Sequence, residues 1–104
     1  MVCNLNYCAH YTKVDVSKHG VVFFDAGRGI GLTGSSVVIV RKDLVGFDLP
    51  TCPDMMSFQK TVTANSIINT PYTLSTLLLA EYIDYCNKNG KSLKNMEAII
   101  RKIK

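Results

Sequence analysis

The residues best suited to chemistry lie in a glycine-rich stretch at 26–34, which reads A-G-R-G-I-G-L-T-G. Glycines at the end of a strand let the backbone approach a ligand or another strand where a Cβ would collide. Arg28, in the middle of this stretch, carries a permanent charge and a planar fork of donors. Such a side chain can hold a phosphate or a carboxylate through two parallel hydrogen bonds. Arg28 is the first candidate binding residue, although by local sequence alone a solvated loop arginine is the better interpretation.

The same stretch matches the dinucleotide-binding pattern G-x-G-x-x-G at Gly29–Gly34. That motif needs a helix directly after it, because the pyrophosphate sits on the helix N-terminus. The residues that follow, Ser35–Arg41, read S-S-V-V-I-V-R, and their β-branched side chains favour a strand. The sequence therefore argues against a dinucleotide site and for a turn between two strands.

Cysteines and histidines show no spacing typical of a metal site. His10 and His19 have no partner at useful spacing, and we expect both at the surface. Met1 leads into a segment without the basic region of a signal peptide. We expect a reduced, cytoplasmic protein without a metal site or a disulfide framework. The cysteines, none of them in a C-x-x-C pair, are Cys3, Cys8, Cys52 and Cys86.

Size and charge limit the remaining function classes. The chain has 104 residues, 47% of them hydrophobic, which suits one small domain of marginal stability. Its formal charge of +4, without a dense basic cluster before residue 88, says little about nucleic acid, and no nucleic-acid partner is expected. The longest apolar run, near residue 77, is too short to cross a membrane.

The glycine-rich stretch is expected to join two strands of one sheet. Alternating and β-branched residues predict strands at Val2–Tyr7, Val21–Asp25 and Ser36–Arg41. After the last of these, Lys42–Gly46 resembles a single helical turn closed by glycine. The segment Phe47–Thr70 then lacks sustained periodicity and contains helix-breaking prolines, so a long loop is expected there.

Two helices are expected in the last third of the chain. The first opens at Pro71 with Thr70 as its cap and ends at Lys88–Gly90. The second covers Ser92–Lys104, with apolar residues at i, i+3 and i+7. Strands followed by helices indicate an α/β or α+β protein. The apolar face of the first helix is expected to consist of Leu74, Leu77, Leu78, Tyr82, Ile83 and Tyr85.

Three stretches, taken in their order and spacing, resemble phosphoserine aminotransferase. They are D-V-S-K-H-G-V-V at 15–22, V-V-I-V-R-K-D-L-V-G at 37–46 and N-T-P-Y-T at 69–73. The similarity runs almost without gaps from about Val2 to Asn89 and more weakly to the end. The resemblance implies an α/β fold, that of the fold-type-I pyridoxal-phosphate transferases.

Family members are several times as long, so the resemblance implies an internal fragment of the large cofactor domain. Residues 1–46 match the end of its sheet, a strand–turn–strand unit with the turn that carries the cofactor lysine. Residues 47–70 match a long interface loop, and residues 71–104 match two helices that lead toward the C-terminal domain.

The resemblance also assigns roles to single positions. The family's cofactor lysine lies in a turn A-Q-K-N-x-G, which places Arg28 at the lysine and Gly27 at the glutamine. The family's V-C-D, whose aspartate pairs with the pyridine nitrogen, matches V-C-N and therefore Asn4. Asn69 and Thr70 match the pair that reaches across a homodimer to the partner's cofactor phosphate. By local physics alone, the same two residues form a helix start.

The family reaction moves an amino group from glutamate to 3-phosphohydroxypyruvate and gives phosphoserine and 2-oxoglutarate, a step of serine biosynthesis. An arginine cannot form the imine that this reaction requires, and Asn4 lacks the charge of an aspartate. We therefore expect a truncated chain that is catalytically inactive and does not bind pyridoxal phosphate covalently. The alternatives are an interaction module that docks onto an intact aminotransferase subunit, or a remnant that does not fold alone.

Overall fold

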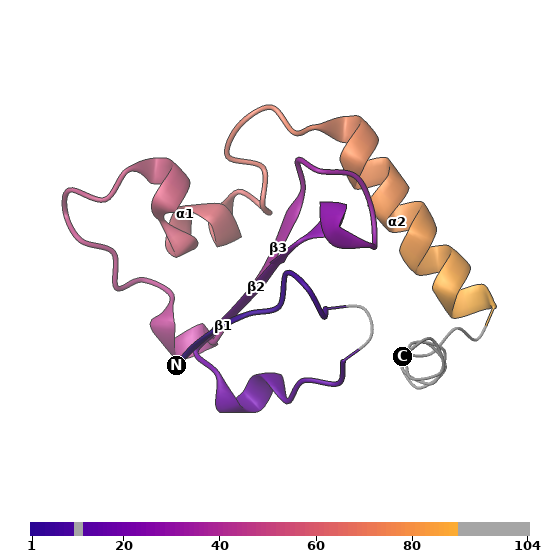
Figure 1. Ribbon diagram of the computed structural model, residues 1–104. Helices are drawn as coiled ribbons and strands as arrows, with labels where there is room; N and C mark the ends of the chain where they lie inside the picture. The colour runs from indigo at the N-terminus through magenta and orange to yellow at the C-terminus, as the bar shows by residue number, and fades with distance from the viewer. Residues whose placement is uncertain (10–11, 90–104) are drawn as a thin grey trace.

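The computed structural model describes residues 1–9 and 12–89, and it contains a small sheet with helices on either side of it (Figure 1). The sheet has three strands in the order β1-β2-β3. The strands are β1 (Val2–Asn4), β2 (Val21–Asp25) and β3 (Ser36–Val40), and the α-helices are α1 (Phe58–Thr63) and α2 (Thr73–Lys88). Short 3₁₀ turns are η1 (Val16–Lys18), η2 (Ala26–Arg28), η3 (Lys42–Leu44) and η4 (Asp54–Met56).

The expected strands are confirmed, with one large change of length. β2 has the predicted bounds, and β3 ends one residue before the predicted Arg41. The strand expected over Val2–Tyr7 is wrong beyond Asn4, because the chain turns there. The carbonyl of Leu5 accepts hydrogen bonds from the amides of Cys8 and Ala9, which closes that turn.

The sheet mixes two kinds of pairing. β1 runs parallel to β2, with Val2 opposite Val21, and β3 runs antiparallel to β2, with Ser36 opposite Asp25. The glycine-rich stretch therefore reverses the chain between β2 and β3, and a strand follows it as predicted. The residues after β3 form the predicted turn η3, and Gly46 beyond it has a φ of +96°.

The loop expected over Phe47–Thr70 is wrong in its middle, where η4 and α1 form. Helix α1 begins after the prolines rather than through them. The side chain of Ser57 caps it by accepting a hydrogen bond from the amide of Lys60 at 3.0 Å. The same hydroxyl donates to Asp48, so the cap is buried and tied to the preceding segment. A six-residue helix is too short to show a hydrophobic period, which is why the sequence did not reveal it.

Helix α2 begins later than expected, at Thr73 rather than Pro71. Tyr72, not Thr70, occupies the N-cap position, and its side chain forms no capping hydrogen bond. The amide of Thr70 donates instead to the side chain of Asn69 at 2.7 Å. The end at Lys88 agrees with the prediction. The second predicted helix, Ser92–Lys104, lies outside the described residues, as does His10.

The hydrophobic core is thin. Among the described residues the buried apolar side chains are Leu5, Val22 and Ala26. The predicted apolar face of α2 is largely exposed, since Leu74, Leu77 and Ile83 are about half accessible. The helix is instead anchored by Ser75, whose buried hydroxyl donates to the carbonyl of Leu32 at 3.0 Å. This contact fixes α2 against the glycine-rich stretch.

Candidate functional site

The parallel pair β1 and β2 brings two of the predicted site residues to one edge of the sheet. Asn4 is the last residue of β1, and Arg28 lies at the end of η2, which directly follows β2. Ligands of α/β proteins bind in the crevice outside the carboxyl ends of parallel strands. The fold therefore places Asn4 and Arg28 where such a protein binds its ligand.

Short side chains connect the ends of these two strands by hydrogen bonds. The side-chain oxygen of Asn4 accepts from the amide of Asn6 at 2.9 Å. The side-chain oxygen of Asn6 accepts from the amide of Asp25 at 2.8 Å, where a further ladder bond would otherwise lie. Asp25 in turn accepts from the amide of Gly27 at 2.6 Å and so caps η2. The position of Arg28 is thus fixed from β1 through these bonds.

Arg28 itself is exposed and lies over an aromatic ring. Its guanidinium carbon is 4.5 Å from the centre of the Tyr7 ring, which is the geometry of a cation–π contact. Gly29, with a φ of +126°, ends η2 directly after it. The stacked guanidinium keeps its N–H edge available for an anion, because the ring covers only one face.

Gly27 is required by close approach rather than by backbone conformation. A Cβ at this position would lie 2.6 Å from the methyl carbon of Thr33 and 2.8 Å from its Cα. The same atom would lie 2.8 Å from the carboxylate of Asp25, which caps the turn. The stretch folds back on itself here, and only a residue without a side chain fits.

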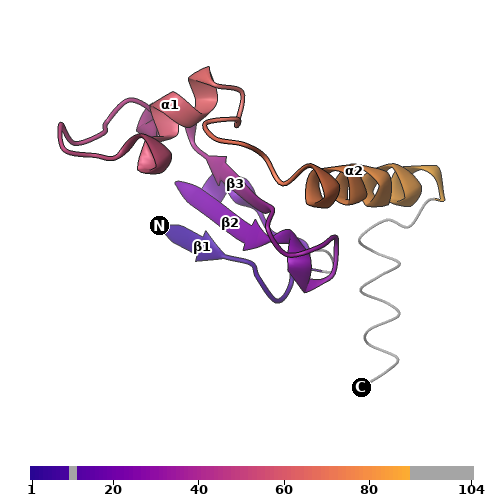
Figure 2. The same ribbon diagram turned by 90° about the horizontal axis from the view of Figure 1, so that it is seen from above.

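The rest of the glycine-rich stretch packs on α2 (Figure 2). Gly34 has a φ of +103°, and a Cβ there would lie 2.6 Å from the ring of Tyr72. Gly31 faces Leu79 at ordinary contact distance. These contacts and the bond from Ser75 seat the first turns of α2 on the turn that carries Arg28.

Asn69 and Thr70 are not brought to this site. Both are exposed in the segment between α1 and α2, and their one recorded hydrogen bond joins the two of them. Within residues 1–9 and 12–89 no hydrogen bond connects them to Asn4, Gly27 or Arg28. The structure thus assembles three of the five predicted positions and leaves the other two on an outer loop.

Sequence reasoning missed the residues that hold the site together. Asp25 had a usable signal, because an aspartate just before a glycine-rich turn is a typical cap. Tyr7 had none, since it reaches Arg28 only through the turn after β1.

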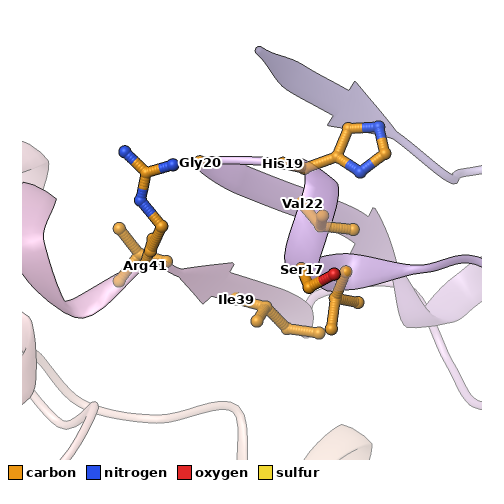
Figure 3. Close-up of a pocket in the computed structure, with 8 residues that line it drawn as sticks. Ser17, His19, Gly20, Val22, Ile39 and Arg41 are labelled. Carbon is orange, nitrogen blue, oxygen red and sulfur yellow. The ribbon is translucent and has the colours of Figure 1, made fainter.

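A separate hollow of about 200 Å³ lies at the opposite end of β2 (Figure 3). Val22 and Ile39 line it together with Ser17, His19 and Arg41. Its one cation is already paired, because Arg41 donates to both carboxylate oxygens of Asp43, at 2.5 and 2.9 Å. This pairing lowers the pKa of Asp43 and raises that of Arg41. His19, expected at the surface, is half-buried, and its Nδ1 lies 3.2 Å from the carbonyl of Asp15.

Within the described part of the chain, no group of histidine, cysteine, aspartate or glutamate side chains could hold a metal ion. Nor is any helix in that part both long and apolar enough to cross a membrane.

Comparison with solved structures defines the class of protein. The fold is that of a pyridoxal-phosphate-dependent transferase, seen in phosphoserine aminotransferase from Bacillus circulans subsp. alkalophilus with a TM-score of 0.87. That match is 27% identical and covers 97% of this chain but 28% of the solved one. The enzyme from Trichomonas vaginalis, solved with bound PLP, has a TM-score of 0.82 at 28% identity. This match covers 94% of the present chain and 27% of the solved one.

Sequence comparison gives the particular family. Phosphoserine aminotransferase from Drosophila melanogaster is 37% identical over 76 residues, which is 73% of this chain and 21% of the enzyme. The enzyme from Laribacter hongkongensis is 34% identical over 90 residues, which is 86% of this chain and 25% of the enzyme. No protein-family model matches the chain. The chain is a partial, diverged relative of phosphoserine aminotransferase and spans about a quarter of the length of these relatives.

The residues at the strand ends do not fit covalently bound pyridoxal phosphate. Among the described residues, this end of the sheet is formed by Asn4, Tyr7, Asp25 and Arg28, none of which has a primary amine. The side-chain oxygen of Asn4 is also turned to its own backbone, at Asn6. An aldehyde therefore has no partner here with which to form an imine.

Proposed function

We propose that this chain is a non-catalytic relative of phosphoserine aminotransferase, with Arg28 at the position of the Schiff-base lysine. The observation that carries the proposal is the position of Arg28, on the turn after β2 and beside the end of the parallel strand β1. The guanidinium there stays charged at every accessible pH and is a poor nucleophile. The amino transfer between glutamate and 3-phosphohydroxypyruvate therefore does not proceed on this chain.

Asn4 supports the same conclusion from the other side of the site. Asn4 stands at the position of the family's aspartate that pairs with the pyridine nitrogen, and its side-chain amide carries no charge. A hydrogen bond to a charged group contributes about 1.5–3 kcal/mol, and this contribution is lost. If a pyridine ring were bound, Asn4 would not hold its nitrogen protonated, and the ring would accept electrons poorly.

Lys18 cannot replace the missing amine. It lies in η1, before β2, and its ammonium is 3.7 Å from the carboxylate of Asp15. The five residues of β2 separate it from Arg28, and at about 3.3 Å per residue they span about 16 Å. We also propose a cytoplasmic location, because the spacing of the cysteines in the sequence is not that of a disulfide framework.

The test is borohydride trapping after addition of equimolar pyridoxal phosphate, with the adduct located by mass spectrometry. We expect no preferred adduct on the natural chain and a preferred adduct at residue 28 in Arg28→Lys. The matched control, Arg28→Gln, lacks both the charge and the amine and should resemble the natural chain. A site-specific adduct on the natural chain, together with transaminase activity, would refute the proposal.

A second candidate function is docking onto an intact aminotransferase subunit. Asn69 and Thr70, which in the family reach across a dimer interface, are exposed, and so are apolar side chains of α2. Tagged chain should then retain co-expressed phosphoserine aminotransferase on an affinity column. Absence of the enzyme from the eluate would exclude this candidate without affecting the first.

A further inference from the structure

Arg28 is a cation without a carboxylate partner in the described part of the chain. The ion pairs found there each join a lysine or an arginine to an aspartate, and none of them includes Arg28. Arg28 instead contacts Tyr7, whose ring covers one face of the guanidinium at 4.5 Å. Both side chains are exposed. The ring therefore holds the guanidinium in place without neutralising it, and the N–H edge stays open to a ligand.

Two amide side chains close to Tyr7 in the sequence have donors that are not used. The side-chain oxygen of Asn4 accepts from the amide of Asn6, and that of Asn6 accepts from the amide of Asp25. Because a backbone amide can only donate, the atom that faces it is the oxygen, and the NH₂ group of each side chain points elsewhere. Neither NH₂ group donates to a residue of the described ranges. The carboxyl end of the parallel pair β1–β2 therefore carries N–H donors from two amides as well as from Arg28.

Asp25 limits the charge that a ligand can carry here. One of its oxygens caps η2 at the amide of Gly27, and its carboxylate forms no ion pair with Arg28. A phosphate monoester, which carries almost two negative charges, would meet one guanidinium and would be repelled by Asp25. A carboxylate carries one charge, and its two oxygens lie in a plane that matches the guanidinium fork. The charges and donors of this cluster therefore favour a carboxylate over a phosphate.

We propose that Arg28, stacked on Tyr7, binds the carboxylate of a small organic acid through two parallel hydrogen bonds, with the amide donors of Asn4 and Asn6 beside it. The cluster lies at the carboxyl ends of parallel strands, where α/β proteins bind small molecules. Tyr7 is a positioning residue, because its ring fixes the plane of the guanidinium. The inference rests on the proposed function, since it makes Arg28 a binding group at a position that lacks a reactive amine.

The experiment titrates the full chain with acetate at neutral pH and constant ionic strength, with chloride as the replaced anion. NMR spectroscopy follows the Nε–H resonance of Arg28 and the side-chain resonances of Asn4, Asn6 and Tyr7. We expect a saturable shift of these resonances. Methyl phosphate is the second probe and should bind more weakly than acetate, because its extra charge is repelled by Asp25.

Variants at position 28 separate two-point binding from simple attraction between charges. Arg28→Gln lacks the charge and should weaken acetate binding about tenfold or more, as measured by the shifts of Asn6 and Tyr7. Arg28→Lys keeps the charge without the planar fork and should bind acetate more weakly than the natural chain does. The matched control is Arg41→Gln, which removes an exposed arginine that already pairs with Asp43 and should leave acetate binding unchanged.

Variants at position 7 test the stacking contact. Tyr7→Phe keeps the ring and should bind acetate within a factor of about two of the natural chain. Tyr7→Leu lacks the aromatic face and should weaken binding about two- to fivefold, because an exposed cation–π contact is lost. Equal binding by the two variants would overturn the positioning role of Tyr7.

Three results would overturn the carboxylate site itself. They are the absence of a saturable shift, acetate binding by Arg28→Lys as tight as that of the natural chain, and tighter binding of methyl phosphate than of acetate. The trapping experiment with pyridoxal phosphate is independent of these. If no adduct forms and acetate does not bind, the non-catalytic assignment stands and this inference alone fails.

Discussion

At the scale of residues, the candidate site depends on a few close approaches. Gly27 has no room for a side chain, since Thr33 and the capping carboxylate of Asp25 occupy the space. Any larger residue at 27 requires the glycine-rich stretch to open. The packing of this turn therefore requires a glycine at position 27.

Gly27→Ala should destabilise the chain by about 1–3 kcal/mol, because the new methyl would lie well inside contact distance of backbone atoms. Gly31→Ala is the matched control. Its Cβ would lie 3.5 Å from the Cβ of Ala26, an ordinary contact. Urea unfolding followed by circular dichroism measures both. Equal midpoints for the two variants would contradict the proposed packing.

At the scale of elements, local polar contacts hold the short turns, and the buried hydroxyl of Ser75 adds a hydrogen bond to the packing of α2 on the glycine-rich stretch. Asp15 accepts hydrogen bonds from the amide and hydroxyl of Ser17 at the start of η1. Arg41 and Asp43 pair across the start of η3. Ser75 connects α2 to the carbonyl of Leu32. Removal of any one of these contacts should reduce the stability of the element that it holds.

Acid should weaken the two turns. Bonds from Ser17 lower the pKa of Asp15, and the bond from Arg41 lowers that of Asp43, both from an ordinary 3.8. A carboxyl with a lowered folded pKa stabilises the fold above its unfolded pKa, and this stability is lost as the pH falls through the folded value. Denaturation midpoints should therefore fall below about pH 4, and Asp43→Asn should remove part of that dependence. A profile unchanged by Asp43→Asn would contradict this assignment.

Ser75→Ala should release α2 from the glycine-rich stretch. The substitution leaves the carbonyl of Leu32 without its partner, at a cost of about 1–3 kcal/mol. Amide exchange in the first turns of α2 should accelerate. Thr76→Ala is the control, because that exposed hydroxyl bonds only to the carbonyl of Tyr72 in its own segment. Similar exchange in both variants would show that Ser75 does not anchor the helix.

At the scale of the whole molecule, the chain is extended and sparsely packed. Its radius of gyration is 15.5 Å, whereas a compact domain of this size has about 13 Å. Figure 1 shows α1 and α2 lying apart on either side of the sheet. The few buried apolar side chains of the described residues therefore limit the stability of the isolated chain.

The isolated chain should therefore melt broadly and below the usual range of about 45–65 °C. Differential scanning calorimetry of the isolated chain measures this transition. A sharp transition within the usual range would contradict the description of a thin core.

The sequence alone determined the strands β2 and β3, the turn between them and the family resemblance, because β-branched runs and glycines act locally. It also led to the prediction that Arg28 stands at the position of the family's cofactor lysine. The sequence did not predict the short helix α1 or the late start of α2. The buried cap at Ser57 and the contact of Tyr72 with Gly34 join segments that are distant in sequence, which no local pattern records. Only the tertiary structure brought Asn4 and Arg28 to the same edge of the sheet and placed Tyr7 under the guanidinium. Parallel pairing of β1 with β2 produces this arrangement, and no local pattern of residues contains that information.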